Sequence, residues 1–105
     1  MPDSVAETEY RIAIDLKPGN IEARNELGHL FYRNNRLDEA IEQFEAVLKI
    51  DNDNVTAQKG MGLILMKQKQ YEAAEKRFRK ALESGEDPLV MKELHELEQL
   101  LEKKR

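Results

Sequence analysis

Residues 21–54 read IEARNELGHLFYRNNRLDEAIEQFEAVLKIDNDN, and residues 55–88 repeat their pattern as VTAQKGMGLILMKQKQYEAAEKRFRKALESGEDP. Aromatic residues mark the repeat, because Tyr10, Phe44 and Phe78 are each separated by 34 positions. Residues of matching size recur at the same offset elsewhere: Ala6, Ala40 and Ala74; Ala13, Val47 and Ala81; Gly28 and Gly62. A fixed period of this length is typical of stacked helical repeats.

The order of residues within each unit resembles the tetratricopeptide repeat (TPR), a helix-turn-helix unit with the pattern W-x2-L-G-x2-Y, then A-x3-F, then P. Leu27-Gly28 and Phe31 match its first helix, and Ala40 and Phe44 match its second. The segment before residue 21 carries only the second-helix signature: Ala6, Tyr10, Ala13 and Pro18. The chain departs from the pattern where the family has Trp or Pro: at Arg24, Gln58, Asn52 and Glu86.

The resemblance implies an all-α, TPR-type α-solenoid, with about six antiparallel helices in a right-handed superhelix. We expect one domain of four segments: the second helix of a truncated TPR at 1–20, TPR units at 21–54 and 55–88, and a C-terminal capping helix at 89–105. The capping helix has an apolar stripe with spacings of four, three and four residues: Val90, Leu94, Leu97 and Leu101. A coiled-coil seam is the alternative, but the stripe is short for one.

Local signals place the ends of the helices. Ser4 begins a capping box for the first helix, and Asp87 precedes a proline as the N-cap of the last one. Asn34-Asn35 predicts a left-handed turn. Its equivalent at Lys69-Gln70 is the weakest point of the pattern, because neither residue favours a positive φ. Glycines inside helices predict a close approach of the paired helix, which we expect to occur at its alanine.

Composition excludes several classes of protein. A net charge of −4 with 36% charged residues argues against nucleic-acid binding, which needs a basic surface. The chain has no cysteine, so the sequence predicts neither disulfides nor a thiolate zinc site. No apolar run approaches the length of a membrane span, and the N-terminus lacks the basic start of a signal peptide. These features favour a soluble, cytoplasmic protein.

Catalytic chemistry is not predicted. The two histidines are His29 and His95, and only His29 has a glutamate three residues before it, at Glu26. A di-iron site needs a second such pair, but Lys92 stands at the equivalent place before His95. No phosphate-binding glycine loop is present. We therefore expect neither an enzyme nor a metal or other cofactor.

The TPR resemblance implies a non-catalytic scaffold that binds a partner peptide or helix in a concave groove lined by the first helices. The positions that face this groove in the family correspond to Glu22 and Glu26 and to the residues that we predict to bind the peptide: Asn25, His29, Tyr32, Arg33, Lys59, Leu63, Met66 and Lys67. Leu63 and Met66 suit an apolar anchor of the partner. The open alternative is that both pack beneath the final helix.

One TPR subclass binds the acidic C-termini of heat-shock chaperones through lysine, asparagine and arginine on successive first helices. The corresponding places in this chain hold other residues: Asn25, His29, Gly60, Val90 and Leu94. Binding to chaperone tails is therefore disfavoured. The partner is expected to be a different protein or peptide.

Self-association is the alternative function. The N-terminal helix has no preceding partner helix, so an isolated monomer would expose a face that includes Val5, Ile12 or Ile14. Ends of natural repeat arrays need polar caps. The sequence thus predicts either further repeats upstream or a homodimer through the N-terminal helix.

Overall fold

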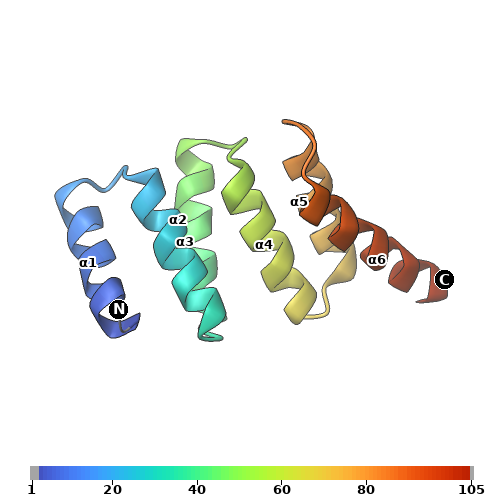
Figure 1. Ribbon diagram of the computed structural model, residues 1–105, viewed down its shortest axis with the longest axis horizontal. Coiled ribbons are helices and arrows are strands. Elements are labelled where there is room, and N and C mark those ends of the chain that lie inside the picture. Colours follow the sequence, from blue (N-terminus) through green and yellow to red (C-terminus); the bar gives the residue numbers. More distant parts are fainter. Residues whose placement is uncertain (1–2, 105) are drawn as a thin grey trace. The chain divides into compact units, whose positions relative to one another are not determined.

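The computed structural model describes residues 3–104, and helices are its regular elements (Figure 1). Within these residues there are six helices and no strand: α1 (Asp3–Leu16), α2 (Ile21–Arg33), α3 (Leu37–Ile50), α4 (Val55–Lys67), α5 (Tyr71–Leu82) and α6 (Pro88–Lys104). None of these helices is long and apolar enough to cross a membrane. The all-α helical-repeat fold predicted from the sequence is confirmed.

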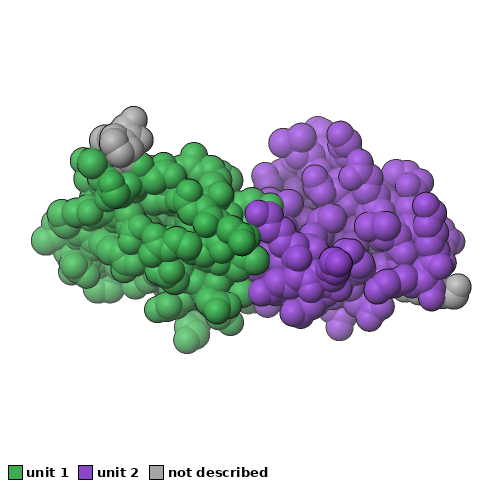
Figure 2. Space-filling model, turned by 90° about the horizontal axis from the view of Figure 1, so that it is seen from below, with its two compact units in different colours: residues 1–52 green, residues 53–105 purple. Residues whose placement is uncertain are grey.

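The chain forms two compact units, residues 1–52 and residues 53–105 (Figure 2). Unit 1 contains α1, α2 and α3, and unit 2 contains α4, α5 and α6. Helix α2 packs against α3 in unit 1, and α4 packs against α5 in unit 2. Each unit therefore contains one pair of helices with the repeat pattern.

The first helix of each pair begins in the same way. Asn20 is the N-cap of α2, and its Oδ1 accepts a hydrogen bond of 3.0 Å from the backbone N–H of Ala23. Asn54 does the same for α4, with a 3.0 Å bond from the N–H of Ala57. Such a side-chain cap satisfies one of the free N–H groups at a helix start.

The repeated glycines make room for an aromatic ring. A Cβ atom at Gly28 would lie 2.9 Å from the Cε1 atom of Phe44, and one at Gly62 would lie 2.6 Å from the Cε1 atom of Phe78. The close approach that we predicted is present, but the expectation that an alanine makes it was wrong. Phe44 and Phe78 are only 2% and 1% exposed, because each ring fills the space over its glycine.

A polar contact between the paired helices recurs with its two residues exchanged. In unit 1, Nη1 of Arg24 on α2 donates a 3.0 Å hydrogen bond to Oε1 of Gln43 on α3. In unit 2, Nη1 of Arg77 on α5 donates a 3.2 Å bond to Oε1 of Gln58 on α4. The repeat offset relates Arg24 to Gln58 and Gln43 to Arg77, so the same bond forms in the opposite direction. Polar residues thus occupy the position where the family pattern has Trp.

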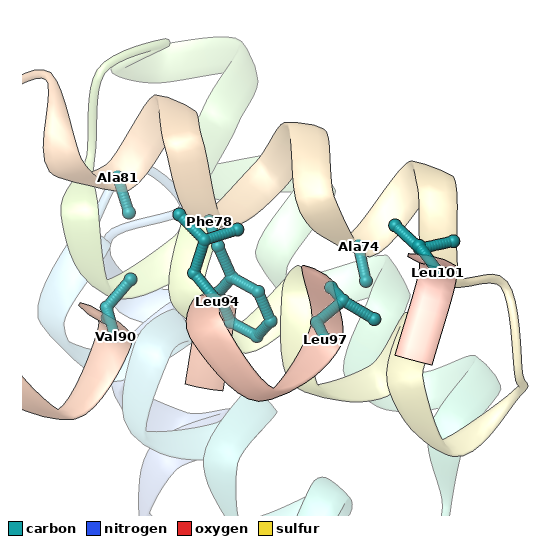
Figure 3. Close-up of a cluster of buried hydrophobic side chains, with 7 residues drawn as sticks. All are labelled: Ala74, Phe78, Ala81, Val90, Leu94, Leu97 and Leu101. Atoms are coloured by element: carbon teal, nitrogen blue, oxygen red, sulfur yellow. The ribbon is translucent and has the colours of Figure 1, made fainter. Parts of the chain in front are cut away.

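The last helix closes unit 2 with its apolar stripe. The stripe residues on α6 meet the repeat residues of α5 in one buried cluster (Figure 3): Ala74, Phe78, Ala81, Val90, Leu94, Leu97 and Leu101. All of these side chains are at most 8% exposed. The predicted burial of the stripe on the final helix is confirmed.

Helix α1 is held differently, since none of its described residues is buried. Its Glu7 accepts a 2.6 Å hydrogen bond from Nη1 of Arg36, and Arg36 also pairs with Glu39 at 2.7 Å. The hydrogen bond from Arg36 lowers the pKa of Glu7 below its ordinary value. Charged contacts therefore contribute to docking α1 on its unit.

The helix begins at Asp3, so the expectation that Ser4 forms its N-terminal capping box was wrong.

Both turns within the helix pairs use a left-handed residue. Asn35 has a φ of 59° and Lys69 has a φ of 61°. The prediction for Asn34-Asn35 is confirmed. Lys69 adopts the same conformation although lysine disfavours it, because the repeat geometry requires a left-handed residue at this position.

Replacing Lys69 by asparagine is expected to raise the free energy of unfolding by about 0.5–1 kcal/mol, because asparagine tolerates the left-handed region better than lysine does. Urea denaturation would measure the change. The reciprocal variant, Asn35→Lys, should lose a similar amount. A Lys69→Asn variant that is less stable than the wild type would contradict this account of the turn.

Candidate functional site

The predicted peptide-binding residues of unit 1 lie on one face of α2, at spacings of four, three and one residue. His29 and Arg33 are exposed, Tyr32 is half-buried and Asn25 is buried. The rings of His29 and Tyr32 stack, with centroids 6.3 Å apart and an interplanar angle of 28°. Nη2 of Arg33 lies 3.5 Å from Oδ1 of Asp3 on α1. The structure thus brings an aromatic pair and a cation to the surface, while Asn25 belongs to the interior.

The equivalent residues of unit 2 lie on α4. Lys67 is exposed, whereas Lys59, Leu63 and Met66 are half-buried. Leu63 and Met66 pack against the buried cluster formed by α5 and α6. Their location agrees with the alternative considered above, in which they support the last helix. Lys67 is the most accessible member of this set.

Lys59 holds the start of α6. Its Nζ donates a 2.8 Å hydrogen bond to Oδ2 of Asp87, and Oδ1 of Asp87 accepts bonds of 3.1 and 3.2 Å from the N–H groups of Leu89 and Val90. The predicted N-cap role of Asp87 is confirmed. The bond from Lys59 is the main cause that lowers the pKa of Asp87, and the bond from the Val90 N–H is the second.

Asp87→Asn is expected to keep the N-cap but to lose the attraction to Lys59. Because the pKa of Asp87 is lowered in the folded state, its contribution to stability is present above its ordinary value of 3.8 and is lost as the pH falls through the lowered folded value. The wild type should therefore lose more stability than Asp87→Asn over that acidic range.

The comparison needs unfolding curves of both proteins at a series of pH values. The other paired carboxylates, such as Glu7, titrate in both proteins and cancel in the difference. Lys59→Met should remove the larger part of this pH-dependent difference, because the bonds from the N–H groups of Leu89 and Val90 to Asp87 remain. Parallel pH profiles for wild type and Asp87→Asn would show that the Lys59–Asp87 pair does not stabilise α6.

A further candidate site, which the sequence did not reveal, is an open cleft of about 550 Å³ between α1 and α2 in unit 1. It is lined by six residues: Tyr10, Ala13, Asn20, Glu22, Ala23 and Glu26. Oη of Tyr10 donates a 3.4 Å hydrogen bond to Oε2 of Glu26. The signal that could have revealed it is the repeat offset, which relates the half-buried Tyr10 to the buried Phe44.

The histidine, aspartate and glutamate side chains of residues 3–104 do not form a metal site. No three His, Cys, Asp or Glu side chains in this range lie where they could hold a metal ion. His29 stacks on Tyr32, and Nε2 of His95 lies 3.3 Å from Nε2 of Gln99 on the same helix. The described histidines therefore have local contacts on the surfaces of α2 and α6.

Comparison with known protein families gives two matches. A family model described as tetratricopeptide repeat matches residues 33–100, and a second model with the same description matches residues 4–55. No curated protein matches the chain. The two matched ranges together extend from α1 into α6.

Proposed function

Because this chain belongs to the tetratricopeptide repeat family, whose repeats generally mediate protein–protein interaction, we propose that it is a non-catalytic scaffold for a protein or peptide partner. The proposed contact residues are those predicted on the first helix of each unit. They are His29, Tyr32 and Arg33 on α2, and Lys59, Leu63, Met66 and Lys67 on α4, whereas the predicted Asn25 is buried. Each unit would contribute its own face to the partner.

The observation that carries this proposal is the stacked pair of His29 and Tyr32 beside Arg33 on α2. Tyrosine and arginine are enriched among the residues that dominate binding at protein interfaces. A stacked ring also loses little side-chain freedom on binding. On α4, the exposed Lys67 offers a charged contact, while Leu63 and Met66 keep part of their apolar surface accessible.

A pull-down with the full chain, followed by a titration of the captured partner, tests the proposal. His29→Ala/Tyr32→Ala and Lys67→Glu are each expected to weaken partner binding by about tenfold or more while the helical circular dichroism is kept. Glu42→Ala/Glu45→Ala is the control, because both glutamates are exposed on α3. Partner affinity that is equal in all four proteins would rule out the α2 and α4 faces.

Self-association through α1 is a second candidate. Exposed apolar residues lie at spacings of seven and four along α1, and hence on one face: Val5 at 42%, Ile12 at 52% and Leu16 at 82%. Ile14, which we expected on this face, is half-buried, and Leu16 is exposed in addition. An apolar stripe of this kind is a common contact between copies of a protein.

Sedimentation equilibrium at micromolar concentration decides between the two candidates. Self-association predicts twice the chain mass of 12.2 kDa and a return to monomer in Ile12→Lys. The scaffold function alone predicts a monomer in both proteins. A dimer that Ile12→Lys leaves intact would exclude the α1 stripe as the contact.

A further inference from the structure

The α1–α2 cleft is lined by Tyr10, and the equivalent rings of Phe44 and Phe78 are covered by a paired helix. The ring of Phe44 meets Gly28 of α2, and the ring of Phe78 meets Gly62 of α4. Those rings are 2% and 1% exposed, whereas Tyr10, at the equivalent repeat position, is half-buried beside an open cleft. In both helix pairs, therefore, an aromatic ring at this repeat position is covered by a helix that places a glycine against it.

Two carboxylates line the cleft and favour an occupant of positive charge. Glu22 and Glu26 are exposed one turn apart on α2, and neither forms an ion pair with a residue in the range 3–104. The only hydrogen bond that either carboxylate accepts within that range comes from Tyr10. In contrast, Glu7 and Glu39 on the same unit are both paired with Arg36. Unpaired carboxylates beside an aromatic ring favour a cationic occupant.

Two of the six residues that line the cleft are alanines. Ala13 on α1 and Ala23 on α2 are the small residues between the two helices. Ala23 is 6% exposed, and Ala13 is half-buried. Small lining residues leave room for the backbone of an occupant, in the same way that glycines on α2 and α4 leave room for Phe44 and Phe78.

We propose that the α1–α2 cleft binds a basic helical segment of a partner protein, with a small residue over the Tyr10 ring and lysine or arginine side chains at Glu22 and Glu26. This inference rests on the proposed partner-binding function and adds the chemistry of the partner. Burial and the nearby Glu26 carboxylate raise the pKa of Tyr10, so the phenol remains a neutral donor beside the glutamates.

A peptide of residues 54–70 of this chain is a suitable probe. It has the first-helix pattern with Gly62, and its charged residues are three lysines, Lys59, Lys67 and Lys69. Fluorescence anisotropy with the labelled peptide and the full chain should show binding that weakens as salt is raised. Glu22→Gln/Glu26→Gln should weaken it by about tenfold or more, because opposite charges are lost from the contact. A peptide with glutamate at the three lysine positions should not bind.

The control is Glu42→Gln/Glu45→Gln, which changes the net charge equally on the exposed face of α3. It should bind the peptide like the wild type. The peptide has the sequence of α4 and could instead displace α4 from unit 2. Binding in the cleft should shift the amide resonances of Ala13 and Ala23, whereas displacement of α4 should leave them unchanged. Equal affinity of the wild type and Glu22→Gln/Glu26→Gln would overturn the inference, as would no binding at about 1 mM peptide.

Two further outcomes separate this inference from the proposed function. If His29→Ala/Tyr32→Ala loses the captured partner and Glu22→Gln/Glu26→Gln retains it fully, the cleft assignment is overturned and the scaffold function stands. If the free chain is a dimer that Glu22→Gln/Glu26→Gln converts to a monomer, the cleft belongs to a second copy, which also overturns the assignment.

Discussion

Replacing Phe44 or Phe78 by alanine is expected to lower the free energy of unfolding by about 3–5 kcal/mol. The two rings are 2% and 1% exposed and fill the space over Gly28 and Gly62. Alanine would leave a cavity at each place, since the helices cannot collapse fully over it. A loss of this size is a large part of the roughly 5–15 kcal/mol that stabilises a typical domain.

Denaturant unfolding of each variant measures this loss. Leu89→Ala is the matched control, because Leu89 is 71% exposed and its truncation should change stability by less than about 0.5 kcal/mol. Phe78 also packs against the stripe of α6, so Phe78→Ala should additionally expose the amides of α6 to hydrogen exchange. A loss below about 1 kcal/mol in both phenylalanine variants would contradict the burial of the rings.

Much of the fold could be predicted because residues with the same local preference recur at the 34-residue period. The N-cap residues Asn20 and Asn54 and the left-handed Asn35 each have a local preference for the conformation that they adopt. Lys69 has no such preference, so only the 34-residue offset from Asn35 pointed to its positive φ. Tertiary structure imposes that turn against the local propensity of its residues.

The candidate site could be predicted only in part. The TPR resemblance assigned His29, Tyr32 and Arg33 to the binding face of α2, but a resemblance does not say which residues of that face are covered. Asn25 is buried, and Leu63 and Met66 pack against the α5–α6 cluster, which depends on the path of α6 after its N-cap. The α1–α2 cleft was missed for a related reason. Tyr10 has the repeat position of the buried Phe44, but the sequence alone does not show that it is only half-buried.

Gly62→Ala is expected to destabilise the protein by about 1–2 kcal/mol, although alanine is the better helix former. The added Cβ would lie 2.6 Å from Cε1, 2.8 Å from Cδ1 and 2.9 Å from Cζ of Phe78. Overpacking of this kind costs about 1–3 kcal/mol, and the gain in helix propensity returns about 1 kcal/mol at most. We expect the overpacking cost to exceed the gain in helix propensity, because the Phe78 ring is held on its other sides by the cluster of α5 and α6.

Comparison of three glycines isolates the clash. The equivalent Cβ at Gly28 would lie 2.9 Å from its nearest ring atom, so Gly28→Ala should cost less than Gly62→Ala. Gly19 has no neighbour within 4 Å, so Gly19→Ala should cost nothing from overpacking. The double variant Gly62→Ala/Phe78→Leu should lose less stability than the sum of its two single variants, because leucine lacks the outer ring atoms that meet the new Cβ. Strict additivity of the two losses would mean that the glycine does not accommodate the ring, and the repeated pairing of glycine with phenylalanine would then need another cause.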